Sequence, residues 1–224
     1  GKVRLDARIA TYVPSAPHGN RITVRQLLSP TSGLHEYLDT PNKKAMTSKP
    51  ATPRQVVAIV ANRPLDFTPG TKFGYSNENY FLLGMIVEAA TNEAYADYVR
   101  AHLLAPAGIT GAATTKDVAT VPNMAVGYSY GNGRSVPVAG IPDDWTWAAG
   151  NLIMTAADLL KWNGALEAGR IVSPATWAQM IEPVKLSDGQ SSGYGLVRNR
   201  NLSRTAQCRA RRGNLRVFVE RSDV

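Results

Sequence analysis

Residues 67–84 read FTPGTKFGYSNENYFLLG, a polar loop that changes abruptly into an apolar run. Over 79–90 nearly every face of a helix would be apolar, which predicts a helix buried on all sides. Taken alone, the motif Tyr75-Ser76-Asn77 is typical of a turn before that helix, with Asn77 as its N-cap. The segment therefore predicts a core helix with a short polar motif at its start.

Capping signals predict further helices on both sides of this segment. Thr23 and Thr52 each precede a glutamine by three residues, the spacing of a capping box, and Pro53 suits a first helical position. One apolar face, made of Tyr95, Tyr98, Val99, His102 and Leu103, predicts an amphipathic helix over 93–104. The other expected helices run from Thr23 to a close at Gly33, from Thr52 to about Asn62, from Thr155 to Leu166 and from Ser173 to Ile181.

Strand signals are weak by comparison. The better candidates are Tyr194–Val197 and Leu215–Val219, and the loop over 110–150 could hold a short pair. The chain has neither an internal repeat nor a low-complexity linker. It is therefore expected to be mainly helical.

Composition excludes several classes of protein. Apolar residues make up 44% of the 224 residues and charged residues 19%, an ordinary globular balance. A single cysteine excludes an intramolecular disulfide framework, and three scattered histidines argue against a His/Cys metal site. No run reaches the ~18 apolar residues of a membrane span, and no signal peptide is recognisable.

The net charge of +8 is concentrated at the carboxyl end. Residues 198–224 hold eight Arg against one Glu and one Asp, whereas residues 1–197 are nearly balanced. Such a tail could bind phosphates, but Phe218 is its one aromatic residue, too few to interleave for base stacking, so no nucleic-acid partner is expected. A frameshifted reading of G/C-rich DNA would also produce excess arginine. We therefore treat 1–197 as one domain and 198–224 as a tail that a frameshift could have produced.

One catalytic pattern can be set aside. Residues 127–131 read GYSYG, the G-x-S-x-G of a nucleophile elbow centred on Ser129. An elbow needs a strand before the serine, a helix after it and a later histidine. Turn residues follow instead, and all three histidines precede Ser129. We expect this match to be accidental.

Four blocks in order resemble the serine β-lactamase-like superfamily, which includes class C β-lactamases, penicillin-binding-protein-like D-Ala-D-Ala carboxypeptidases and related esterases. The most specific is the Tyr-Ser-Asn setting in 67–84, and the others are KVRLD at 2–6, ITVRQLLSPTSGL at 22–34 and AAGNLIMTAAD at 148–158. The resemblance implies an α+β fold of the β-lactamase/transpeptidase type. This chain would be a fragment dominated by the helical domain, with few strands.

The resemblance also implies roles for particular residues. Tyr75, with its pKa lowered by a nearby lysine ammonium, would shuttle a proton to the leaving group. Asn77 would bind the amide side of the substrate and orient that lysine, while Ser76 occupies the variable middle position of the catalytic motif. Trp145, Trp147 and Asn151 flank a block near the family's substrate pocket and could line it, although core packing also suits both tryptophans. The family implies no metal and no cofactor.

The family's nucleophile motif is not found in this sequence. No serine has a lysine three positions later, the spacing that puts both side chains on one helical face. The third motif, Lys-Thr-Gly or His-x-Gly, is also absent. We therefore expect a serine hydrolase acting on a β-lactam, a D-Ala-D-Ala peptide or a small ester, inactive as this truncated chain. The alternative is a non-catalytic interaction protein that kept the helical scaffold.

The same resemblance sets the expected partners and location. The substrate would be a small molecule or resemble peptidoglycan. By likeness to the family, the protein would be periplasmic or secreted.

Overall fold

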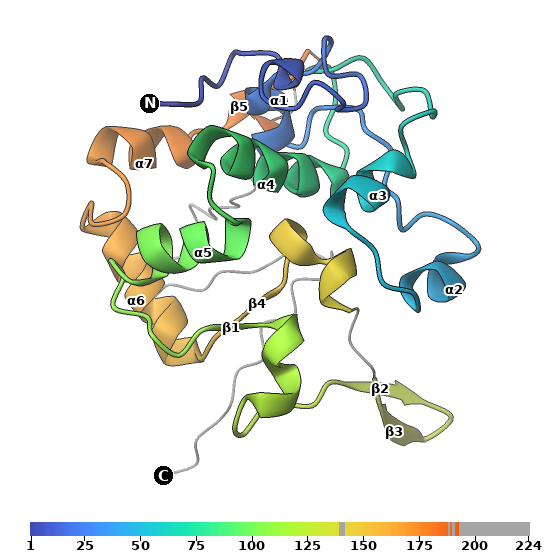
Figure 1. Ribbon diagram of the computed structural model, residues 1–224, viewed down its shortest axis with the longest axis vertical. Coiled ribbons are helices and arrows are strands. Elements are labelled where there is room, and N and C mark those ends of the chain that lie inside the picture. Colours follow the sequence, from blue (N-terminus) through green and yellow to red (C-terminus); the bar gives the residue numbers. More distant parts are fainter. Residues whose placement is uncertain (139–141, 188, 190, 193–224) are drawn as a thin grey trace.

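The computed structural model describes residues 1–138, 142–187, 189 and 191–192 (Figure 1). Helices dominate it. They are α1 (Val24–Leu28), α2 (Lys43–Thr47), α3 (Pro53–Ala58), α4 (Glu78–Thr91), α5 (Tyr95–Val99), α6 (Ala156–Glu167) and α7 (Pro174–Met180). Shorter turns are the 3-10 segments η1 (Ile9–Thr11), η3 (Thr115–Thr120), η4 (Asp143–Trp145) and η5 (Trp147–Ala149), and the π-helical η2 (Arg100–Leu104).

The strands in the described residues are short and pair only two by two. Each sheet is antiparallel: β1 (Ala113–Thr114) pairs with β4 (Leu152–Ile153), β2 (Tyr128–Gly131) with β3 (Arg134–Pro137), and β5 (Val184–Lys185) with β6 (Ser191–Ser192). The described residues form mostly helices with a few short strands, which confirms the expected α+β class. The candidate strands at Tyr194–Val197 and Leu215–Val219, and the whole 198–224 tail, lie outside the described residues.

The main core is built around α4, as its composition predicted. Phe81, Leu82 and Ile86 are buried on this helix. Helices α1 and α3 and the turn η5 pack against it (Figure 1). A second, smaller cluster joins η2 to α6 through Leu104 and Ala165. Burying apolar area on nearly all sides of one helix is what makes α4 the centre of the fold.

The capping signals located helix starts correctly, but two predicted helix ends were wrong. Thr23 and Thr52 both form full capping boxes with the glutamines three residues later. However, α1 ends at Leu28 rather than continuing toward Gly33, because Pro30 cannot extend a helix. Helix α3 ends at Ala58, and the chain then tightens into turns such as Arg63 N–H to Val60 O at 3.0 Å.

The predicted helix over 93–104 forms, but it changes pitch. After α5 the π-helical η2 begins at Arg100. The wider π turn shifts the buried face by one position. Val99 and Leu104, five residues apart, are therefore buried, whereas the predicted Leu103 is only partly so and His102 is exposed.

The GYSYG motif forms a hairpin strand rather than a nucleophile elbow. Ser129 lies in β2 opposite Val136 of β3, and both strands are exposed throughout. In Figure 1 this hairpin projects from the edge of the molecule. A serine in an exposed hairpin has neither the strand–helix turn nor the enclosed surroundings that activate an elbow nucleophile.

A glycine allows α4 and η5 to touch. A Cβ added at Gly84 would lie 2.6 Å from the Cβ of Ala148 and 2.8 Å from the ring of Trp147. The absence of a side chain therefore brings the 148–158 block directly against the core helix.

Candidate active site

Two loops bring the Tyr-Ser-Asn motif to the start of α4. Backbone N–H groups of the 66–74 segment donate to carbonyls of the loop over 30–33, with Gly70 to Thr31 at 2.8 Å and Gly74 to Pro30 at 2.9 Å. Gly33 has a φ of +76°, and a Cβ there would lie 2.3 Å from the carbonyl oxygen of Phe67. Only glycine suits position 33, so the close contact between the two loops requires a glycine there.

Tyr75 and Asn77 face each other at the surface. The Tyr75 hydroxyl donates to Asn77 Oδ1 at 2.9 Å, and the tyrosine is 52% exposed. Partial burial raises the pKa of Tyr75, and the Glu36 carboxylate raises it further. The lowered pKa expected for Tyr75 requires the lysine of a Ser-x-x-Lys motif, which this sequence does not contain, so it stays a prediction. In this chain Tyr75 is a protonated hydrogen-bond donor at neutral pH.

Asn77 occupies the N-cap position of α4, but its side chain does not cap the helix. Its backbone is already helical (φ −64°, ψ −26°), and the side chain makes no capping bond. Instead Asn77 Nδ2 donates to both carboxylate oxygens of Glu36 at 3.1 Å, and the Asn77 backbone N–H donates to Glu36 Oε2 at 2.6 Å. The expectation of an asparagine cap was therefore wrong, because the Asn77 amide bonds to Glu36 and Tyr75 instead of to a first-turn N–H group of α4.

Sequence reasoning missed Glu36. It lies 41 residues before Asn77 and belongs to no helix. The only available signal was its position two residues after the TSGL that ends the 22–34 block.

Ser76 points away from this pair. It is 1% exposed, and its hydroxyl donates to the carbonyl of His35 at 3.3 Å. His35 is itself held by Asp66 through Nδ1 and by Arg63 through Nε2. The described contacts of Ser76 therefore anchor the motif to the loop beneath it.

Two polar residues lie buried beneath the motif. Asn79 Oδ1 accepts a hydrogen bond from Ser32 Oγ at 2.6 Å. Asn79 Nδ2 has no hydrogen-bond partner among the described residues. The Glu78 carboxyl makes no hydrogen bond of ordinary geometry there, although the Tyr37 backbone lies near enough to lower its pKa in part. Burial, together with the nearby Glu36 charge, raises the pKa of Glu78 to about 9. Glu78 is therefore a neutral acid at pH 7.

The three residues expected to line a pocket divide between the core and a pocket wall. Trp145 is 5% exposed and donates from Nε1 to the carbonyl of Lys49 at 2.7 Å. Trp147 packs its ring between Phe81 and Tyr95. These contacts are those of core residues. Their role toward substrate stays a prediction.

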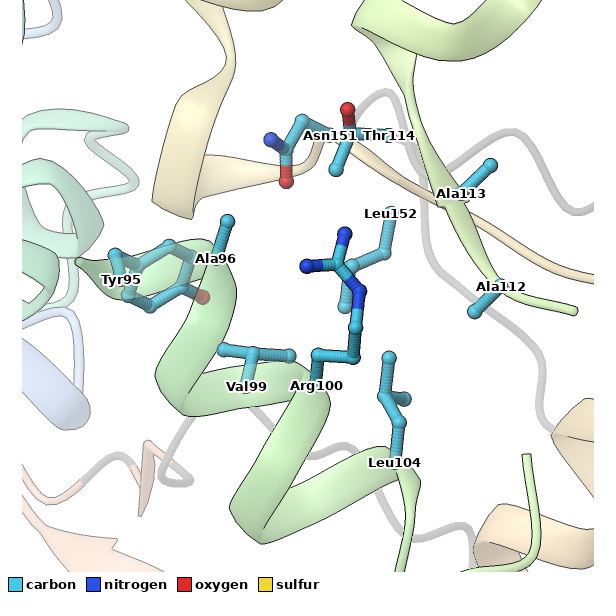
Figure 2. Close-up of a pocket in the computed structure, with 10 residues that line it drawn as sticks. All are labelled: Tyr95, Ala96, Val99, Arg100, Leu104, Ala112, Ala113, Thr114, Asn151 and Leu152. Carbon is cyan, nitrogen blue, oxygen red and sulfur yellow. The ribbon is translucent and has the colours of Figure 1, made fainter. Parts of the chain in front are cut away.

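Asn151 lies in the wall of a shallow pocket between η2 and the β1–β4 pair (Figure 2). It is buried and donates from Nδ2 to Asp143 Oδ1 at 2.9 Å. Figure 2 shows the Arg100 guanidinium reaching from η2 toward Asn151. The pocket is lined by Tyr95, Ala96, Val99, Arg100, Leu104, Ala112, Ala113, Thr114, Asn151 and Leu152.

Tyr80 lies in α4, three residues after Asn77. Burial raises the pKa of Tyr80, and the phenols of Tyr75 and Tyr95 lie near enough to raise it further. Tyr95 lines the pocket and packs on Trp147 at a centroid distance of 5.3 Å. Of these three tyrosines, Tyr95 is therefore the one that lines the pocket.

Two further properties of the described residues are their capacity to bind a metal ion and the capacity of their helices to span a membrane. In the part of the chain that the structure describes, no group of three or more His, Cys, Asp or Glu residues could hold a metal ion. Among these same residues, no helix combines the length and apolar character needed to cross a membrane.

Comparison with known proteins places these features in a family. The sequence model of the family described as Beta-lactamase matches residues 1–199. PbpX of Bacillus subtilis (strain 168) is 30% identical over 197 residues, which cover 88% of this chain and 47% of that protein. Penicillin-binding protein 4* of the same organism is 26% identical over 211 residues, covering 87% of this chain and 46% of the relative. The chain thus spans about half the length of these curated relatives.

A solved structure supports the same assignment. The D-stereospecific amidohydrolase from Streptomyces sp. superposes with a TM-score of 0.76 at 28% identity, over 87% of this chain and 63% of that one. The expected β-lactamase/transpeptidase-like fold is therefore confirmed.

Proposed function

Since this chain belongs to the beta-lactamase family, we propose that it supplies the Tyr-x-Asn side of a serine acyl-transfer site. The observation that supports this most strongly is the hydrogen bond of 2.9 Å between Tyr75 and Asn77, which lies at the solvent-exposed start of a buried helix. A half-exposed phenol held by a neighbouring amide can reach a bound substrate and remain in place.

The proposed chemistry needs a serine and a lysine from a Ser-x-x-Lys motif, which this sequence does not contain. The serine oxygen would attack a carbonyl carbon while the lysine amine takes the hydroxyl proton. Tyr75 would then pass its phenol proton to the leaving nitrogen or oxygen and regain one from the lysine ammonium, and Asn77 would hold the amide side of the substrate. Ser76 would support these two from below through its bond to the loop. The chain by itself would not turn over substrate.

The substrate we propose is a β-lactam, a D-Ala-D-Ala-type peptide, or a small ester or amide. Relatives named as penicillin-binding proteins favour the first two. The amidohydrolase named as D-stereospecific favours an amide of a D-configured residue. Asn151 and Tyr95, which line the described pocket, would form the wall along which such a substrate lies. A peptidoglycan-like substrate would place the protein outside the cytoplasm, in the periplasm or secreted.

The test is a chimera in which residues 1–197 are joined to the Ser-x-x-Lys and carboxyl-terminal segments of a beta-lactamase-family protein that contains both. We expect labelling by a fluorescent penicillin, or hydrolysis of a chromogenic cephalosporin or a p-nitrophenyl ester. Tyr75→Phe should lower the acylation rate about 10²–10⁴-fold, the usual contribution of a positioned acid–base group. Tyr128→Phe, on the exposed hairpin, is the matched control and should leave the rate unchanged.

Two results would contradict the proposal. A Tyr75→Phe chimera that acylates within about threefold of its parent would make Tyr75 a structural residue. A folded chimera that no substrate acylates would favour the non-catalytic interaction protein.

A further inference from the structure

We propose that Glu36 is the positioning residue of this site: its carboxylate fixes the orientation of the Asn77 amide and, through it, the direction of the Tyr75 hydroxyl. This inference rests on the proposed function, because it assigns the partner that arranges the Tyr-x-Asn pair. It stands on hydrogen bonds that join a loop to the start of α4.

Glu36 is itself held in place. Its Oε1 accepts from the backbone N–H of Leu38 at 3.0 Å, and its Oε2 accepts from the backbone N–H of Asn77 at 2.6 Å. A carboxylate that accepts two backbone bonds from two separate segments has little freedom to rotate. The loop over 34–38 and the start of α4 are thereby joined through one side chain.

The carboxylate then dictates which way the Asn77 amide points. Both carboxylate oxygens accept from Nδ2 at 3.1 Å, so Nδ2 faces Glu36 and Oδ1 faces Tyr75. The reversed amide would set Oδ1 against two negative oxygens, and its Nδ2 could not accept the Tyr75 proton. With this orientation set, the phenol donates to Asn77, and its lone pairs stay available to another group.

The surroundings keep the Glu36 charge directed at this pair. In the described residues no Lys, Arg or His forms an ion pair with Glu36. The acidic groups packed near it are Tyr37, Tyr75 and Glu78, each of which has its pKa raised in part by the Glu36 charge. Among the described residues, the Glu36 carboxylate therefore faces the Asn77 amide rather than a cationic side chain.

The inference can be tested on this chain without any turnover. Tyrosines carrying ¹³C at Cζ report the Tyr75 pKa by NMR, with Tyr75→Phe to assign the signal. Glu36→Gln should lower the Tyr75 pKa. It should also move the Asn77 backbone amide proton upfield and speed its exchange, because the short bond to a carboxylate is lost. Asp39→Asn removes an exposed charge three residues away and is the matched control. It should change none of these signals.

A second variant separates position from charge and covers the case in which Glu36→Gln fails to fold. Glu36→Asp keeps the charge but shortens the side chain by one methylene. The Asn77 amide signals should change as in Glu36→Gln, while the Tyr75 pKa stays raised. Unchanged Asn77 signals in both variants, or equal effects from Asp39→Asn, would overturn the proposal. The NMR signals of this chain do not depend on acylation. A chimera that fails to react would therefore contradict the proposed function without changing the result of this test.

Discussion

The backbone N–H of Asn77 donates to Glu36, 41 residues earlier in the chain, at 2.6 Å. A negative side chain therefore lies at the N-terminus of α4, where the partial positive charge of the helix favours it. The asparagine that the local sequence offers as a cap is free to face Tyr75 instead. One contact thus stabilises the core helix and arranges the candidate site.

This relationship predicts that Asn77→Asp is worse for folding than Asn77→Ala. The aspartate would place a second carboxylate against Glu36, and like charges at such a distance raise the pKa of one of them. We expect Asn77→Asp to cost roughly 1–3 kcal/mol more than Asn77→Ala at pH 7, the penalty of an unsatisfied polar contact. Urea unfolding at pH 7 and pH 4 measures it. The extra cost of Asn77→Asp over Asn77→Ala should be smaller at pH 4, because carboxylates that take up protons no longer repel each other. An aspartate that matched or exceeded wild-type stability at pH 7 would show that Asn77 is a cap after all.

Glu78 should make stability depend on pH. Its pKa is about 9 in the fold against the ordinary glutamate value of 4.5, so the folded state holds the proton more tightly. Stability from this group is therefore present below about pH 4.5 and is lost progressively as pH rises toward 9, at no more than ~1.4 kcal/mol per pH unit. Glu78→Gln should flatten this decline in urea midpoints between pH 5 and 9. Glu182→Gln, at an exposed site, should leave the slope of this decline unchanged. An identical slope in wild type and Glu78→Gln would refute the assignment.

Gly84→Ala should destabilise the protein although it improves helix propensity. The new Cβ would meet Ala148 at 2.6 Å and Trp147 at 2.8 Å. Overpacking of this kind costs typically ~1–3 kcal/mol, more than the ~1 kcal/mol gained from replacing glycine in a helix. Gly164→Ala in α6 is the matched control, because nothing lies within 4 Å of its added Cβ, and it should stabilise. Thermal unfolding compares the two, and equal shifts would mean that α4 and η5 are not in contact.

The chain alone should not hydrolyse a chromogenic cephalosporin or a p-nitrophenyl ester. It has no Ser-x-x-Lys, and Ser129 lies in an exposed hairpin. The measurement is initial rate against buffer, with Ser129→Ala as the control. Turnover that disappeared in Ser129→Ala would restore the nucleophile-elbow reading that the hairpin excludes.

Local patterns predicted those elements whose stabilising contacts are close in sequence. The capping boxes at Thr23 and Thr52 formed as expected because each cap reaches only three residues along the chain. Helix α4 was predictable because its residues are apolar on nearly all sides, so that burial of the whole segment stabilises the helix. The end of α3 and the π turn at Arg100 were not predictable in this way, since packing against other segments decides both.

The sequence by itself determined the family, the buried helix and the Tyr75–Asn77 spacing, because these are written in contiguous residues. The tertiary structure alone decided that Asn77 faces Tyr75, that Glu36 bonds to Asn77 at the helix start and that Glu78 is neutral. Each of these three features depends on the Glu36 carboxylate, which comes from a distant loop, and on the exclusion of water from its surroundings when the chain folds. A hydrogen bond across 41 residues and a pKa set by burial leave no periodic or local trace in the sequence, so only the folded chain reveals them.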